Sequence, residues 1–202
     1  MAEIYFTEEG HMYRRGDGAI IPSATTILQG IFPPRFPYPP SAATRGKLGH
    51  RATQLYDEDD LDEVGLDPLT ARYLAGWKKF RRETGFVPTA IEKIVYSEIY
   101  GYAGTLDRIG TFPNHATVNR DAGGTHRSKP AVVDIKTGSF VFWHPLQTAA
   151  YALCLDVPHD RYCVYLKSDG TYSMESHGNR KDGQVFLAAA TIYKVRKENG
   201  YE

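Results

Sequence analysis

The sequence contains few cysteines, and this excludes several kinds of metal site. Two cysteines among 202 residues, Cys154 and Cys163, are too few for a disulfide framework or for a four-cysteine zinc or iron–sulfur site. With His159 between them they form a C-x4-H-x3-C pattern. We interpret this pattern as core cysteines rather than as metal ligands, because an isolated cysteine usually behaves as a small hydrophobic residue.

The chain also lacks long hydrophobic runs and an excess of either charge. No stretch approaches the roughly 18 unbroken apolar residues of a membrane span, and the N-terminus has no basic and then apolar run typical of a secretory signal. We therefore expect a soluble, intracellular protein without a membrane partner. The formal net charge is zero, with 24 basic and 24 acidic residues, so composition alone does not indicate a nucleic-acid binder.

The hydrophobic residues of the chain suffice for one hydrophobic core. A chain of 202 residues with 42% hydrophobic residues predicts a single domain over residues 1–202. No internal repeat is found, and no G-x-x-x-x-G-K-[ST] loop, so a helicase motor would have to be a separate protein.

Glycine, proline and capping residues predict the elements of the first half. For residues 1–40 we expect a hairpin around residues 14–18, a short helix capped by Ser23 that ends near Gly30, and an extended proline-rich connector at 33–40.

Two longer helices are expected to follow, separated by an acidic segment. Ser41 is predicted to cap a helix that reaches about Tyr56, and the acidic segment 57–67 is interpreted as a solvated turn. The next helix ends at Gly85 behind the basic segment KKFRR, which suits the negative end of a helix dipole, although a phosphate contact stays open. Its apolar stripe contains Leu69, Tyr73, Trp77 and Phe80.

In the second half of the chain, alternating apolar and polar residues predict mainly strands. Strands are predicted at 91–100, 102–111, 131–136, 161–167 and 170–176, with a mobile loop at 112–130. Two helices complete the pattern: 144–155 with Leu146, Ala150 and Leu153 inward, and 182–197 with Val185, Phe186, Ala189, Ile192 and Tyr193 as its apolar face. These elements predict an α/β (α+β) layered fold with a central mixed sheet flanked by helices.

Charged residues inside two of these strands indicate chemistry. Because side chains alternate along a strand, Asp134 and Lys136 share one face while Val133 and Ile135 point into the core on the other. Asp107 lies within the neighbouring apolar strand and would approach Asp134 if the strands pair. Two close carboxylates call for a cation, and oxygen ligands suit Mg²⁺ or Mn²⁺. A lysine beside such a metal can orient an attacking water.

These residues resemble the PD-(D/E)XK nuclease superfamily, and three features resemble its RecB-like exonuclease branch. The segment RGKLGH at 45–50 is similar to the motif that supplies a helical metal-binding histidine, here His50. Gln147 and Tyr151 are similar to the branch's Q-x-x-x-Y helix. The order of the motifs is that of the branch, and IPSATTIL looks like the opening of phage-encoded and mitochondrial-maintenance exonucleases. The resemblance covers roughly residues 20 to 155.

The resemblance implies a restriction-endonuclease-like core and a role for each matching residue. His50, Asp107, Asp134 and the Ile135 carbonyl would hold one or two Mg²⁺ or Mn²⁺ ions, and Lys136 would position the attacking water. Asp107, Asp134 and Lys136 are thus the candidate catalytic residues. Gln147 and Tyr151 would align DNA or support Lys136. The further candidates are Arg45, Lys47, Arg108 and Thr137 as phosphate contacts, and Glu92 as an additional acid, for which Glu98 competes.

The implied activity is metal-dependent hydrolysis of DNA ends or single strands without sequence specificity, in the cytoplasm of a bacterial or phage-infected cell. DNA is the expected partner, with a recombination or replication protein as a further one. The residue before Asp107 is Leu106 rather than proline, a departure that is common in the branch, and the cysteine count rules out the members with an iron–sulfur cluster.

Two other interpretations stay open. The chain could be a nuclease-like DNA-binding module that does not cleave. Alternatively, Asp134 and Lys136 could form a structural ion pair in an unrelated α/β protein, in which case His50 should lie far from Asp107.

Overall fold

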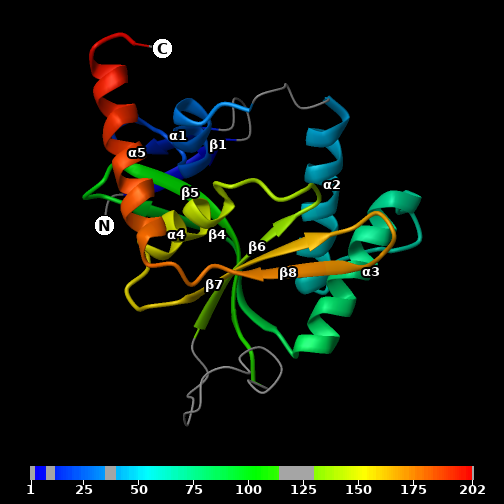
Figure 1. Ribbon diagram of the computed structural model, residues 1–202. Coiled ribbons are helices and arrows are strands. Elements are labelled where there is room, and N and C mark those ends of the chain that lie inside the picture. Colours follow the sequence, from blue (N-terminus) through cyan, green and yellow to red (C-terminus); the bar gives the residue numbers. More distant parts are fainter. Residues whose placement is uncertain (1–2, 8–11, 35–39, 114–129, 202) are drawn as a thin grey trace.

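The computed structural model describes residues 3–7, 12–34, 40–113 and 130–201, which form an α/β fold with two sheets (Figure 1). The larger sheet has the order β4-β5-β6-β7-β8, and of its neighbouring pairs only β6 and β7 are parallel. This confirms the expected layered fold with a central mixed sheet. The strands are β4 (Val87–Ser97), β5 (Tyr102–Thr111), β6 (Pro130–Lys136), β7 (Asp160–Leu166) and β8 (Tyr172–Ser176).

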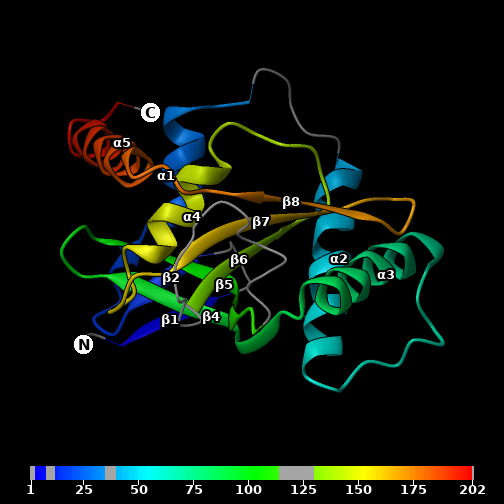
Figure 2. The same cartoon turned by 60° about the horizontal axis from the view of Figure 1, so that its bottom comes forward.

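The helices form two groups beside this sheet. They are α1 (Ala24–Ile31), α2 (Pro40–Asp57), α3 (Pro68–Thr84), α4 (His144–Ala152) and α5 (Lys181–Glu198). Helices α2 and α3 pack together at one side, and α1, α4 and α5 pack together at the other, as Figures 1 and 2 show from two directions. In the described part of the chain, no helix is long and apolar enough to cross a membrane.

Strand β6 separates two hydrophobic clusters, and its alternation decides where the charged residues go. Val132 belongs to the cluster that includes α1, α4 and α5, whereas Val133 and Ile135 pack into the cluster built by α3. Side chains of a strand alternate between faces, so Asp134 and Lys136 lie on the α4 side. The predicted separation of the charged pair from Val133 and Ile135 is confirmed.

The N-terminal elements agree with their signals. A small sheet contains β1 (Ile4–Thr7), β2 (Met12–Arg15) and β3 (Ile20–Ile21), and the expected hairpin turn joins β2 to β3. Ser23 caps α1, because its side chain accepts a hydrogen bond of 2.9 Å from the Thr26 N–H.

Helix α2 begins earlier than predicted. Pro40 is its first residue, so Ser41 lies inside the helix rather than at its cap, and the predicted connector loses its last residue. Proline suits a first helical position, because its φ is already helical and its missing N–H would have no partner there. Residues 35–39 of that connector lie outside the described residues.

Three apolar residues predicted to face inward are exposed. Helix α4 ends at Ala152, so Leu153 is 42% exposed, and Val185 and Ile192 of α5 are 44% and 52% exposed. The buried face of α5 is narrower than its apolar pattern and consists of Phe186, Ala189 and Ala190 besides Asp182.

The ends of the predicted loop 112–130 belong to the fold. Phe112 is buried against Phe86, with ring centroids 5.0 Å apart, and Pro130 begins β6. Residues 114–129 lie outside the described residues.

Candidate metal centre and its pocket

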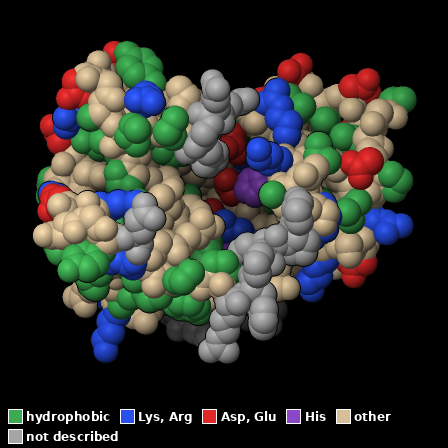
Figure 3. Space-filling view, turned by 90° about the horizontal axis from the view of Figure 1, so that it is seen from above, with side chains coloured by type: hydrophobic (Ala, Val, Ile, Leu, Met, Phe, Trp, Pro, Cys, Tyr) green, Lys and Arg blue, Asp and Glu red, His purple; other side chains and the backbone are tan. Residues whose placement is uncertain are grey.

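A cavity of about 370 Å³ contains most of the predicted site residues. In the space-filling view the surface is hollowed between two lobes, and a histidine side chain lies in the hollow beside acidic side chains (Figure 3). Residues from α1, α2, β4, β5, β6 and α4 line the cavity, so segments far apart in the sequence meet here. The charged and imidazole groups of the lining are His50, Lys47, Glu92, Asp107, Asp134 and Lys136.

Three of these side chains form a cluster that could hold a metal ion. His50 Nδ1 lies 3.3 Å from Asp107 Oδ1, and His50, Glu92 and Asp107 each offer a ligand atom within 4.8 Å of the others. Burial alone would raise the pKa of the Asp107 carboxyl, but the nearby His50 and Lys136 charges lower it to about 2. Asp107 is therefore an anion at neutral pH, as a ligand must be.

Glu92 reaches the cluster through an unusual backbone conformation. Its φ is +47° within β4, a left-handed conformation that costs a residue with a side chain about 1–2 kcal/mol. The pairs Ile91–Arg108 and Lys93–Leu106 flank it, so Glu92 faces Asp107 across the two strands. Burial, with the Asp107 charge, raises the pKa of Glu92 to about 7. Glu98, the competing candidate, is exposed and does not line the cavity.

Asp134 and Lys136 form a tight pair beside the cluster. Lys136 Nζ lies 2.6 Å from Asp134 Oδ2 and donates a 3.0 Å hydrogen bond to Gln147 Oε1. Burial alone would lower the pKa of Lys136, but the Asp134 carboxylate outweighs it and raises the pKa. Burial also raises the pKa of Asp134 despite the ammonium. Asp134 is not a member of the three-residue cluster, so its role as a metal ligand stays a prediction.

A chain of hydrogen bonds fixes Gln147 behind Lys136. Gln147 Nε2 donates to Thr25 Oγ1 at 3.0 Å and to the Tyr151 hydroxyl at 2.8 Å. A helical turn separates Gln147 from Tyr151, which is why one amide can contact the other side chain. Sequence analysis did not single out Thr25, although it lies in the IPSATTIL segment that carries part of the resemblance.

Asp107 also ties its own strand to β6. The Ile135 N–H donates a 2.6 Å hydrogen bond to Asp107 Oδ2. These two strands do pair, with Arg108 opposite Val133, so the condition for bringing Asp107 near Asp134 is met. The structure thus gives a role to the amide of Ile135, and metal binding by its carbonyl stays a prediction.

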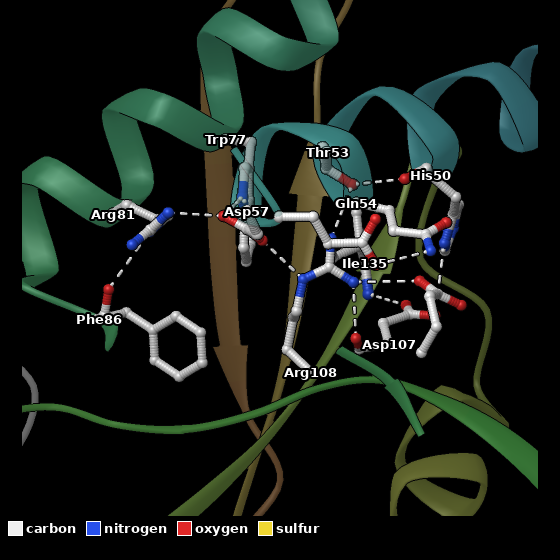
Figure 4. Close-up of polar contacts among 12 residues, drawn as sticks. His50, Thr53, Gln54, Asp57, Trp77, Arg81, Phe86, Asp107, Arg108 and Ile135 are labelled. Carbon is white, nitrogen blue, oxygen red and sulfur yellow. Dashed lines mark hydrogen bonds and ion pairs between the residues drawn. The ribbon is translucent and has the colours of Figure 1, made fainter. Parts of the chain in front are cut away.

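The prediction that Arg108 contacts a phosphate is wrong. Its side chain is 0% exposed, and its guanidinium contacts the Asp57 carboxylate at 2.6 Å (Figure 4). The guanidinium contacts the Glu92 carboxylate at 3.0 Å. It also donates to the Asp107 carbonyl and the Thr53 hydroxyl. Arg108 therefore holds the Glu92 carboxylate and the Asp107 backbone in position, and none of the arginine side chain is open to a ligand.

The interpretation of residues 57–67 as a solvated turn is wrong at its first residue. The Asp57 side chain is 0% exposed and accepts hydrogen bonds from Trp77, Arg81 and Arg108. Arg81, from the basic segment of α3, is thus an ion-pair partner. The helical period could have indicated that Asp57 faces the interior. Asp57 lies two turns after His50 in α2 and is therefore on the same face of the helix.

The remaining candidates differ in position. Lys47 is exposed and lines the cavity, whereas Arg45 is half-buried, donates to Ser41 Oγ at 3.2 Å and is not part of the lining. Thr137 lies against α2, where a Cβ at Gly49 would come within 2.7 Å of its methyl group. Gly49 thus lets the helix that carries His50 approach the end of β6.

Comparison with models of known protein families finds no matching family, and comparison with curated proteins finds no match. The geometry itself bears on two open questions. The ion-pair interpretation placed His50 far from Asp107, yet their closest side-chain atoms are 3.3 Å apart. Of the cysteines, Cys163 is buried and Cys154 half-buried, and neither belongs to a potential metal cluster among the described residues.

We expect a methyl group at Gly104, which lines the cavity, to disturb the site by displacing Tyr151. A Cβ there would lie 2.6 Å from Cε1 of Tyr151, whose ring is 4% exposed. In Gly104→Ala the ring must move, which should cost about 1–3 kcal/mol of unfolding free energy and loosen the contact of Tyr151 with Gln147. Urea denaturation measures this loss. Gly178→Ala is the matched control, since its Cβ meets no atom within 4 Å, and equal stability of both variants would contradict the prediction.

Proposed function

We propose that this protein is a divalent-metal-dependent deoxyribonuclease of the PD-(D/E)XK type, most similar in its motifs to the RecB-like exonucleases. The observation that carries the proposal is the meeting of His50, Glu92 and Asp107 with the Asp134–Lys136 pair in one cavity. A structural ion pair needs no such cluster beside it, whereas metal-dependent phosphodiester hydrolysis uses a bound metal and is helped by a positioned cation beside it.

The donor set fits Mn²⁺ or Mg²⁺. Two carboxylates and an imidazole are ligands that Mn²⁺ accepts, and Mg²⁺ binds through one or two carboxylates with water completing its shell. When bound, such an ion would acidify a water and stabilise negative charge on the phosphate. His50, Glu92 and Asp107 would hold it, and Asp134, which lines the same cavity and pairs with Lys136 through Oδ2, would add a ligand through its other oxygen.

Lys136 would orient the attacking water. An ammonium has three donors, and Asp134 and Gln147 occupy two of them. Because the Asp134 carboxylate raises its pKa, Lys136 stays protonated at neutral pH and can donate the third bond to the water or to the phosphate. Gln147, Thr25 and Tyr151 fix the position of that amine, a contribution to orientation.

The experiment is a digestion series on end-labelled linear, blocked-end and circular DNA, single- and double-stranded, with Mg²⁺, Mn²⁺ or EDTA. We expect cleavage only with metal, release of short products from free ends, and intact circular DNA. DNA binding without cleavage under all of these conditions would instead support a non-cleaving binding module.

Glu92 offers a direct test of the metal ligands. In Glu92→Gln we expect the affinity for Mn²⁺ to fall by at least about tenfold. Mutation of a residue that only hydrogen-bonds to a metal ligand already lowers metal affinity by roughly 10- to 100-fold. Isothermal titration with Mn²⁺ measures this affinity. The control is Glu98→Gln, the same change at an exposed position of the chain. Unchanged affinity in Glu92→Gln would remove Glu92 from the ligand set.

A further inference from the structure

The loop between β6 and α4 exposes two aromatic rings next to the site. It follows Lys136 directly, and Phe140 and Phe142 within it are 52% and 58% exposed. A single exposed hydrophobic side chain is ordinary on a protein surface. Two exposed aromatic rings separated by one residue, four and six positions after the lysine of the site, concentrate apolar surface in the loop that follows the site in the chain.

Both rings are held in place by other rings. Phe142 makes an edge contact with Phe32, with centroids 5.1 Å apart and planes at 81°, and Phe140 makes one with His144, at 6.1 Å and 81°. His144 is itself fixed, since its Nδ1 accepts from the Val141 N–H at 3.3 Å and contacts the Tyr165 hydroxyl at 2.9 Å. Each Phe ring is therefore supported along part of its surface and open over the rest.

The supports belong to the same helices that build the cavity. His144 begins α4, and Gln147, whose amide oxygen contacts Lys136, follows one helical turn later, about 5 Å along the helix axis. Phe32 caps the end of α1, whose first turn carries Thr25, the other partner of Gln147. The rings and the site are thus parts of one rigid arrangement.

We propose that Phe140 and Phe142 form a stacking platform for the bases of a single nucleic-acid strand whose phosphate occupies the cavity. This inference rests on the proposed function and names its substrate as a single strand or an unpaired end. The faces of bases inside a duplex are covered by their neighbours, so only an unpaired strand can lay them on the rings. Stacking accepts every base, which agrees with cleavage without sequence specificity.

Binding of a labelled single-stranded oligothymidylate, measured by fluorescence anisotropy with Mg²⁺, tests the platform. A Lys136→Met background prevents cleavage during the measurement. Each ring replaced by leucine should weaken binding by about 5- to 150-fold, the range measured for base–aromatic stacking. Leucine keeps apolar contact with Phe32 or His144 while removing the flat face. Tyr201→Leu, at an aromatic side chain that is 67% exposed near the end of α5, should bind as the background protein does.

An abasic oligonucleotide separates stacking from a structural effect of the loop. The background protein should bind the abasic strand more weakly than the normal strand, and the double leucine variant should bind both equally. The first half of this comparison needs no substitution in the loop. Equal binding of abasic and normal strands by the background protein would overturn the platform.

Hydrolysis of the abasic oligonucleotide with Mn²⁺ distinguishes failure of the platform from failure of the proposed function, because this phosphodiester carries neither a base nor another aromatic ring that could stack on the platform. Wild type and the double leucine variant should hydrolyse it at the same rate. Hydrolysis with base-independent binding would overturn the platform alone. If wild type cleaves neither the abasic strand nor normal DNA while base-dependent binding persists, the nuclease function is overturned and the platform stands.

Discussion

Replacing Lys136 with methionine should lower the rate of metal-dependent DNA cleavage by about 10²- to 10⁴-fold, the range of a positioned proton donor or acceptor. Methionine keeps the length of the side chain and removes the ammonium that contacts Asp134 and Gln147. The loss should appear in kcat, because the ammonium acts on charge that develops during the reaction. End-labelled DNA with Mg²⁺ or Mn²⁺ provides the measurement.

The same change at an exposed lysine is the control. Lys194 lies on α5 with 73% of its side chain exposed, so Lys194→Met should cleave as wild type does. Mn²⁺ affinity in Lys136→Met should stay within a few fold, because Lys136 is not a member of the metal cluster. Full activity of Lys136→Met would remove the lysine from the mechanism. A matching loss of metal affinity would mean that the lysine acts by holding the ligands.

Local periodicity made part of this site predictable from the sequence. The alternation of β6 separates Asp134 and Lys136 from Val133 and Ile135, and one helical turn joins Gln147 to Tyr151. The layered fold followed from the same periods, together with helix-capping signals such as Ser23.

The features that sequence analysis missed depend on contacts between distant segments. Arg108 looked like a surface cation, but its partner Asp57 lies 51 positions away in a segment whose composition is that of a solvated turn. Glu92 adopts a left-handed backbone within β4, between the paired residues Ile91 and Lys93, and no local pattern in VPTAIEKIVYS indicates that conformation. A charged side chain is buried only where a partner compensates for its lost hydration. When that partner is distant in the sequence, only the folded structure identifies it.

Because of these buried contacts, loss of the Asp57 charge should lower stability strongly. The Asp57 carboxylate accepts hydrogen bonds from Arg81 Nη1 and Arg108 Nε, both at 2.6 Å, and from the Trp77 indole N–H at 3.0 Å. Asp57→Asn keeps the shape but leaves the buried Arg108 with only Glu92 as a charged partner. Breaking a buried ion pair in this way costs about 3–5 kcal/mol, so the free energy of unfolding in urea should fall by that amount.

Two further variants decide whether the loss comes from the buried pair. Asp60→Asn makes the same change at an exposed residue three positions later and should alter stability by about 0.5 kcal/mol at most. Arg108→Leu removes the cation, so adding it to Asp57→Asn should cost less than it costs alone. That coupling is expected because an arginine without its carboxylate no longer stabilises the fold. Additive losses, or a loss below about 1 kcal/mol in Asp57→Asn, would contradict a stabilising role for the pair.

Since Arg108 also holds Glu92 and the Asp107 carbonyl, Asp57→Asn should further weaken Mn²⁺ binding even at temperatures where the variant is folded.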